Sequence, residues 1–110
     1  MTRGDVVTVA AGGDFGKPRP AVVVQSDELG ETDTVIVCLI SSTLRDAAFH
    51  RLAVAPAEGS GLQLPSQIML DKVMTVKRRK VGRKIGELSP DLVPELNSRL
   101  AFVLGLADPS

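Results

Sequence analysis

The residue in this sequence whose type and setting most clearly suit a chemical role is an arginine between two prolines. Arg19 stands between Pro18 and Pro20, directly before the apolar run 21–24. Proline fixes φ and donates no backbone hydrogen bond, so the two prolines are expected to stiffen this segment and hold Arg19 outside the sheet ladder. A guanidinium is a planar fork of donors that suits a phosphate or a carboxylate. The alternative is a loop arginine paired with a surface carboxylate.

Hydroxyl groups and a carboxylate interrupt two further apolar regions. Three hydroxyl residues, 41–43, follow the apolar run 35–40, and Asp71 lies inside a second β-rich region. One guanidinium, one or two hydroxyl donors and one carboxylate can bind a phosphodiester, activate an adjacent hydroxyl and stabilise developing charge. The set lacks the extra carboxylates of a two-metal nuclease. The alternatives are a turn for the hydroxyl run, and a turn or an edge-strand ion pair for Asp71 with Lys72.

The one histidine and the one cysteine predict neither a metal site nor a nucleophile. His50 is expected to be structural or at the surface, although histidine is the usual general base near neutral pH. Cys38 falls inside the apolar run 35–40, which predicts a buried and inert thiol. A single cysteine excludes an internal disulfide and fits a reducing compartment. The two residues leave no plausible zinc set, so we expect no metal and no cofactor.

Length and composition predict one cytoplasmic domain over residues 1–110. Thirteen basic and thirteen acidic residues give zero formal charge, which is not typical of a general nucleic-acid coat protein. Tyr and Trp are absent and only three Phe are present, which nearly excludes an aromatic platform for stacking bases. No apolar run is long enough to span a bilayer, and no signal region follows the N-terminal charge.

Positive charge is nevertheless concentrated in one short segment that contains no acidic residue. We call it the basic segment; its cationic members are Lys77, Arg78, Arg79, Lys80, Arg83 and Lys84. It could follow an RNA backbone or meet an acidic protein tail, and neutralising it should then flatten the salt dependence of RNA binding. The alternative is a solvated hairpin.

The elements that must position these residues are short strands and one closing helix. Apolar runs bounded by turn signals predict strands over 5–10, 21–25, 34–40, 51–54, 66–70, 72–76 and 85–88. The unbroken apolar character of 21–25 favours a central strand. The glycine-rich segment 11–18 is predicted to be a mobile loop, and 57–63 a turn or a short helical turn.

The last part of the chain has a helical period. One apolar face is formed by Leu92, Val93, Leu96, Leu100, Val103 and Leu104. Ser89 and Pro90 suit a helix start, whereas a start capped by Asp91 places Pro94 safely in the first turn. Gly105 is expected to stop the helix. The whole pattern predicts a mainly β, α+β fold, a small bent antiparallel barrel with a C-terminal helix packed on one side.

The ordered set of motifs resembles the MazF/PemK toxin family. The resemblance begins with RGDVV at 3–7 and GKPRPAVVV at 16–24, and it continues through 35–43. It then covers 61–76 and ends with IGELSP at 85–90, which leads into the helix. Each piece alone is weakly specific, but together they cover nearly the whole chain in order.

The resemblance implies both a fold and an activity. The family fold is an SH3-like β-barrel with a C-terminal helix, usually as a homodimer. Its members are metal-independent endoribonucleases that cut single-stranded mRNA at short sequences. The ribose 2′-hydroxyl is the nucleophile, and the products carry a cyclic phosphate and a 5′-hydroxyl. A labile cognate antitoxin of the MazE/PemI type inhibits the toxin.

Roles for individual residues are implied by the same resemblance. Arg19 would be the phosphate clamp and a candidate proton donor, and Ser41 or Ser42 would hydrogen-bond the phosphate, with the register open by one residue. Asp71 would orient the site or act as a base. The residues expected to contact RNA are Lys17, Thr43, Lys72, Lys77 and Arg78.

Two positions depart from the family pattern, and two other functions remain as alternatives. Lys72 stands where the family usually has glutamine, and Met69 where some members have a catalytic arginine. Lys72 could instead supply a second positive charge to the phosphate. A DNA gyrase poison of the CcdB type shares the fold but relies on an aromatic C-terminal end, which the tail 107–110 lacks. A non-catalytic SH3-like module would bind RNA or protein, with strong salt dependence, without cutting.

Overall fold

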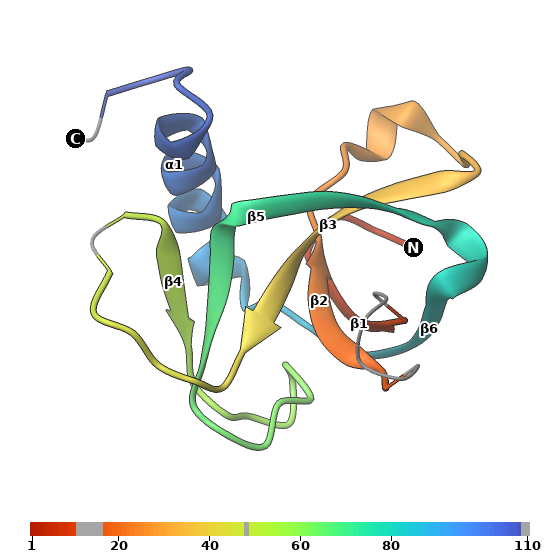
Figure 1. The fold of residues 1–110 in the computed structure, drawn as a ribbon, viewed down its shortest axis with the longest axis horizontal. Helices are drawn as coiled ribbons and strands as arrows, with labels where there is room; N and C mark the ends of the chain where they lie inside the picture. Colours follow the sequence, from red (N-terminus) through yellow and green to blue (C-terminus); the bar gives the residue numbers. More distant parts are fainter. Residues whose placement is uncertain (11–16, 48, 109–110) are drawn as a thin grey trace.

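The fold is built on one antiparallel sheet of six strands in the order β4-β5-β3-β2-β1-β6 (Figure 1). The computed structural model describes residues 1–10, 17–47 and 49–108, so most of the glycine-rich segment 11–18 lies outside the described residues. The strands are β1 (Asp5–Val9), β2 (Arg19–Val23), β3 (Thr34–Ser41), β4 (Arg51–Val54), β5 (Ser66–Lys77) and β6 (Val81–Glu87). Three 3₁₀ turns, η1 (Asp27–Leu29), η2 (Arg78–Lys80) and η3 (Pro90–Leu92), and one helix, α1 (Val93–Val103), complete the described elements.

The sheet is open in its strand pairing. Within the described ranges, β4 pairs with β5 and β6 pairs with β1, and these two strands form the edges of the sheet. The expected closed barrel is therefore not seen in the hydrogen-bond ladder. The predicted central position of β2 is confirmed, since β1 and β3 flank it.

Both faces of the sheet are largely buried along β1, β2 and β3, which explains the unbroken apolar runs in these strands. On one face, α1 packs beside β4 and β5 over a core that includes Val22, Ile68, Leu96 and Leu100 (Figure 1). The other face carries a valine-rich core, whose buried members are Val7, Val9, Ala21, Val23, Val35, Val37 and Val76. Successive residues of a strand point to opposite faces, so a strand buried on both faces cannot alternate polar with apolar residues.

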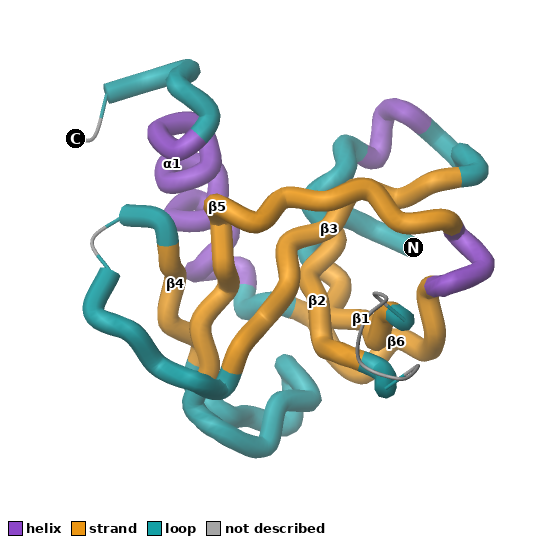
Figure 2. Tube along the Cα trace, in the orientation of Figure 1, coloured by secondary structure: helices purple, strands orange, loops and turns teal. Residues whose placement is uncertain are grey.

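The two strands predicted around Asp71 are one long strand. β5 bends sharply along its length (Figure 2), and its register with β3 shifts between the pairs Ile40–Ile68 and Cys38–Val73. A β-bulge absorbs extra residues and turns the strand without ending it. The polar pair at 71–72 therefore marks a bulge, where the sequence prediction placed a break.

Arg19 lies inside the sheet ladder, which corrects the expectation that its prolines hold it outside. It is the first residue of β2 and pairs with Val9 of β1. Pairing with β3 begins only at Ala21, so Pro20 lies where β2 still has one described neighbour. Proline is tolerated at the start of a strand because few ladder bonds depend on its missing N–H.

The last strand and the helix start differ from the prediction in their bounds. β6 begins at Val81, four residues earlier than expected, because backbone pairing with β1 does not require apolar side chains at an edge. Ser89 caps η3, and its Oγ accepts from the Asp91 N–H at 3.4 Å. α1 follows with Leu92 as its N-cap residue, and Pro94 falls in the first turn as required. Asp91 is therefore not the cap of α1.

The end of α1 follows the prediction except at one apolar position. Gly105 has a φ of 76°, and the Leu106 N–H donates to the Ala101 carbonyl at 2.7 Å, which is a Schellman-type ending. Leu96 and Leu100 are buried, but Leu104 is 56 % exposed because it lies past the last helical turn. No helix among the described residues is long and apolar enough to cross a membrane.

Cys38 is buried as predicted, and burial has a measurable chemical consequence. Desolvation raises the pKa of its thiol to about 11; the positive charge of Arg3 opposes this shift and the negative charge of Asp71 adds to it. Because the thiolate is the reactive form, we expect iodoacetamide at pH 8 to leave the native protein unlabelled. Mass spectrometry should find full labelling once guanidinium unfolds the chain. Rapid labelling of the folded protein would contradict the assignment of Cys38 as inert.

Candidate active site

A groove of about 450 Å³ brings together the guanidinium and the hydroxyl run singled out in the sequence. Its polar lining comes from Arg19 at the start of β2, from the hydroxyl run 41–43 at the end of β3, and from Ser66 at the start of β5. Its apolar floor is formed by Pro20, Leu39, Met69 and Met74. The groove thus combines a charged fork, hydroxyl donors and an apolar surface in one concave site, as ligand sites commonly do.

Strand register explains why these residues meet. Ala21 pairs with Leu39, so Arg19 and Ser41 lie two residues further along, at the same end of neighbouring strands. Ala21 and Leu39 both belong to the valine-rich face. Because side chains of one face recur every second residue, Arg19 and Ser41 also project to that face. The groove is therefore the polar end of the valine-rich face of the sheet.

The three hydroxyl residues are not equivalent. The Ser41 hydroxyl accepts from the Thr43 N–H at 3.0 Å and donates to the Thr43 carbonyl at 3.4 Å. These two bonds form the turn that was the alternative prediction for the hydroxyl run. They engage the Ser41 oxygen within the protein. Ser42 is exposed, and among the described residues no hydrogen bond engages its hydroxyl. Ser42 is thus better placed than Ser41 to donate to a ligand.

Two residues that the sequence analysis did not select hold the loop after β3. The Gln67 carboxamide oxygen accepts from the Arg45 N–H at 3.0 Å and from Arg51 Nη1 at 2.9 Å, and its nitrogen donates to the Arg45 carbonyl at 2.9 Å. Arg51 Nη1 also donates to the Thr43 carbonyl at 3.0 Å. The sequence marks Gln67 only as a polar residue directly before the apolar residues of a strand. The residues that it binds cannot be read from the sequence.

Asp71 and Lys72 lie outside the lining of the groove. Both are exposed at the bulge of β5, and Lys72 Nζ lies 3.9 Å from Asp71 Oδ2. The ion pair foreseen as an alternative is therefore present. The structure brings Arg19 to the hydroxyl run, but it does not add this carboxylate to the groove.

The cations expected to contact RNA also fall outside the groove, and one of them is already engaged. Lys17 is exposed just before β2, and Lys77 is exposed at the end of β5. Arg78 Nε donates to the Thr32 carbonyl at 2.6 Å, and the Arg78 N–H donates to the Asp33 carbonyl at 2.8 Å. Arg78 therefore fastens the turn η2 to the segment before β3.

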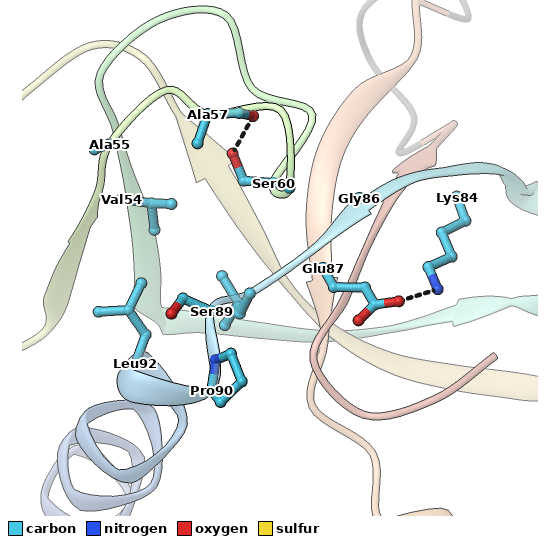
Figure 3. Close-up of a pocket in the computed structure, with 12 residues that line it drawn as sticks. Val54, Ala55, Ala57, Ser60, Lys84, Gly86, Glu87, Ser89, Pro90 and Leu92 are labelled. Atoms are coloured by element: carbon cyan, nitrogen blue, oxygen red, sulfur yellow. Dashed lines mark hydrogen bonds and ion pairs between the residues drawn. The ribbon is translucent and has the colours of Figure 1, made fainter.

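A second hollow, of about 520 Å³, lies between β6, the turn at 57–60 and the start of the helical region (Figure 3). Its charges are paired with each other, since Lys84 Nζ lies 2.7 Å from Glu87 Oε1 and 3.4 Å from Asp5 Oδ1. The hydrogen bond to Glu87, with Asp5 adding to it, raises the pKa of Lys84. The Ser60 hydroxyl donates to the Ala57 carbonyl at 3.1 Å (Figure 3). Lys84, Glu87 and Ser60 in this hollow therefore already have partners within the protein.

Comparison with known proteins assigns the chain to a family. Residues 2–104 match the model of the PemK-like, MazF-like toxins of type II toxin–antitoxin systems. This chain belongs to the PemK/MazF toxin family. The resemblance predicted from the ordered motifs is thereby confirmed. Among the described residues no group of His, Cys, Asp and Glu could hold a metal ion.

Two curated relatives of this family member are named endoribonucleases. A probable endoribonuclease MazF of Mycolicibacterium smegmatis is 35 % identical over 108 residues, which span 97 % of this chain and 99 % of that protein. Endoribonuclease EndoA of Bacillus subtilis is 27 % identical over 114 residues, which span 98 % of this chain and 97 % of that protein. Both matches run through the strands that carry Arg19 and the hydroxyl residues.

Solved structures share the fold of this family member. An endoribonuclease in complex with its cognate antitoxin, from a mycobacterial species, superposes with a TM-score of 0.82 at 24 % identity, covering 99 % of both chains. A MazE–MazF crystal structure from Deinococcus radiodurans gives a TM-score of 0.74 at 20 % identity, covering 97 % of both chains. The six-stranded sheet with its C-terminal helix is therefore the family architecture.

Proposed function

We propose that this MazF-like endoribonuclease toxin cuts single-stranded mRNA at short sequences, without a metal ion, by attack of a ribose 2′-hydroxyl on the adjacent phosphorus. The observation that supports this most directly is the meeting of Arg19 and Ser42 across one groove. The 2′-oxygen forms a bond to phosphorus while the bond to the 5′-oxygen breaks. The 2′-hydroxyl loses its proton and the departing 5′-oxygen gains one, which leaves a cyclic phosphate and a 5′-hydroxyl.

The chain's own residues would act mainly on the charge of the phosphate. Negative charge grows on the non-bridging oxygens as the fifth bond to phosphorus forms. The Arg19 fork can hold two of these oxygens, and the Ser42 hydroxyl can donate to one of them. Donors fixed in place before the reaction stabilise the transition state without reorganisation. Asp71 lies outside the groove, so the proposal gives it no proton-transfer role.

The test is cleavage of a long RNA by the purified protein, read by primer extension. We expect cuts at a recurring short sequence, and we expect them to persist in excess EDTA because attack by the RNA's own 2′-hydroxyl needs no metal-bound water. A matched RNA with a 2′-deoxyribose at the cut position should remain intact, since it lacks the nucleophile. Binding without cutting would support the non-catalytic module, and loss of cutting in EDTA would contradict metal independence.

We further propose that a cognate antitoxin of the MazE/PemI type binds the toxin and that the toxin is a homodimer. Exposed apolar side chains support protein partners, because Leu104 and Leu106 are 56 % and 77 % exposed beside a groove of about 590 Å³. A small DNA-binding protein with an acidic tail, encoded in the neighbouring reading frame, should co-purify with the toxin and abolish cleavage. Light scattering of the isolated toxin should give twice the mass of one chain.

A further inference from the structure

We propose that Gln67 and Arg51 are positioning residues, which hold the loop 42–45 so that its hydroxyl group faces Arg19. The inference rests on the proposed ribonuclease function and adds two residues to it. Neither residue lines the groove. We call the pair the Gln67–Arg51 clip.

The clip uses nearly the whole hydrogen-bonding capacity of one carboxamide. Its oxygen accepts from the Arg45 N–H and from Arg51 Nη1, and its nitrogen donates to the Arg45 carbonyl. A carboxamide that grips both the N–H and the C=O of one residue replaces the pair of bonds that a neighbouring strand would make. The Gln67 side chain therefore pairs with the backbone of Arg45, beyond the end of β3, as a neighbouring strand would.

Arg51 reaches past Gln67 to the loop itself. Its Nη1 donates both to Gln67 Oε1 at 2.9 Å and to the Thr43 carbonyl at 3.0 Å. The N–H of Thr43 is in turn held by the Ser41 hydroxyl at 3.0 Å. Residues on both sides of Ser42 are thus fixed, at Thr43 and at Ser41, while the Ser42 side chain is exposed to the groove.

The backbone of Gln67 is held within the sheet, whereas the loop that its side chain binds belongs to no strand. Gln67 sits in β5 between Ser41 of β3 and Ala53 of β4, with a backbone partner on each side. The loop residues 42–46 are all exposed. Exposed loops with few contacts have low local stability. A displacement of about 1 Å in a catalytic group can cost about a hundredfold in rate, so a fixed loop matters for cleavage.

The direct test is Gln67→Met, which keeps the length of the side chain and removes all three of its hydrogen bonds. We expect kcat for RNA cleavage to fall by about ten- to a hundredfold with a smaller change in KM, because a donor to the phosphate acts most strongly where negative charge grows in the transition state. Gln67→Glu keeps the acceptor for Arg51 and should recover part of the loss. The matched control is Gln63→Met, at an exposed position outside the groove.

A double-mutant cycle separates positioning from general destabilisation. If Gln67 acts through the Ser42 hydroxyl, Gln67→Met should lower kcat by a far smaller factor in a Ser42→Ala background than in the wild type. A purely structural role predicts that Gln67→Met lowers kcat by the same factor in both backgrounds. Arg51→Met is the second variant, which removes the bond to Thr43 and leaves the Gln67 bonds to Arg45 in place. It should lower kcat in the same way and remains informative if Gln67→Met does not fold.

The outcomes distinguish this inference from the proposed function. An RNA that the wild-type protein leaves intact overturns the proposed function and, with it, the role of the clip. A wild-type protein that cuts, with clip variants that cut equally fast or with additive costs in the cycle, overturns the clip alone. Reduced kcat with coupling to Ser42, together with faster hydrogen exchange of the Arg45 amide, supports it.

Discussion

Arg19→Ala is expected to lower the rate of RNA cleavage by about a hundred- to a thousandfold, which is typical of removing one main donor to a developing oxyanion. Arg19 supplies the only guanidinium among the residues described as lining the groove. Without it, the phosphate would face hydroxyl groups and methionine side chains, which cannot balance a growing negative charge. The measurement is the single-turnover rate on an RNA of defined cut site.

Arg19→Lys tests whether charge alone is sufficient. Lysine keeps the positive charge but lacks the planar fork, so we expect only a small part of the rate to return. Gln63→Ala is the control, because Gln63 is exposed and lies outside both the groove and the basic segment. Its kcat should remain at the wild-type value. Cleavage by the Arg19→Ala variant at the wild-type rate would show that the active site lies elsewhere.

Gly61→Ala is expected to lower the free energy of unfolding by about 2–5 kcal/mol, since it combines backbone strain with overpacking. Gly61 has a φ of 73°, where a side chain is strained. An added Cβ would also fall on the backbone carbonyl of Ile85. The turn cannot move away easily, because the Glu87 N–H donates to the Gly59 carbonyl at 2.7 Å and joins the turn to β6.

Gly59→Ala is the control for this prediction within the same turn. A Cβ at Gly59 would meet nothing within 4 Å, and surface changes of this kind usually stay within about 0.5 kcal/mol. Urea unfolding followed by circular dichroism gives both values. Equal stability of the two variants would mean that the turn does not pack against the edge of β6 as described.

Local chemistry made several elements predictable from the sequence. β-branched runs between turn signals predicted β3 to within one residue and the bounds of β4 as observed. The helical period and Gly105 predicted α1 and its end, because capping and amphipathicity are local properties. The apolar setting of Cys38 predicted its burial. These features depend on residues that are close together in the chain.

Features that depend on strand pairing were predicted less well. The long β5 was read as two strands, because a bulge and a break look alike in a sequence. The early start of β6 was missed since its partner, β1, supplies the pairing. Arg19 was expected outside the ladder, although pairing with Val9 places it inside. The open edges at β4 and β6 likewise follow from pairing alone.

Residue types and their order determined that this protein carries an arginine between two prolines, a hydroxyl run and the motif order of the PemK/MazF family. Only the tertiary structure decided which of these residues meet. Register between β2 and β3 brings Arg19 to the hydroxyl run that begins at Ser41, while Asp71, at the bulge of β5, lies outside the groove. It also joins Gln67 to Arg45, twenty-two residues away in the chain. The physical reason is that antiparallel pairing is non-local, so a strand's sequence does not specify what lies across from it.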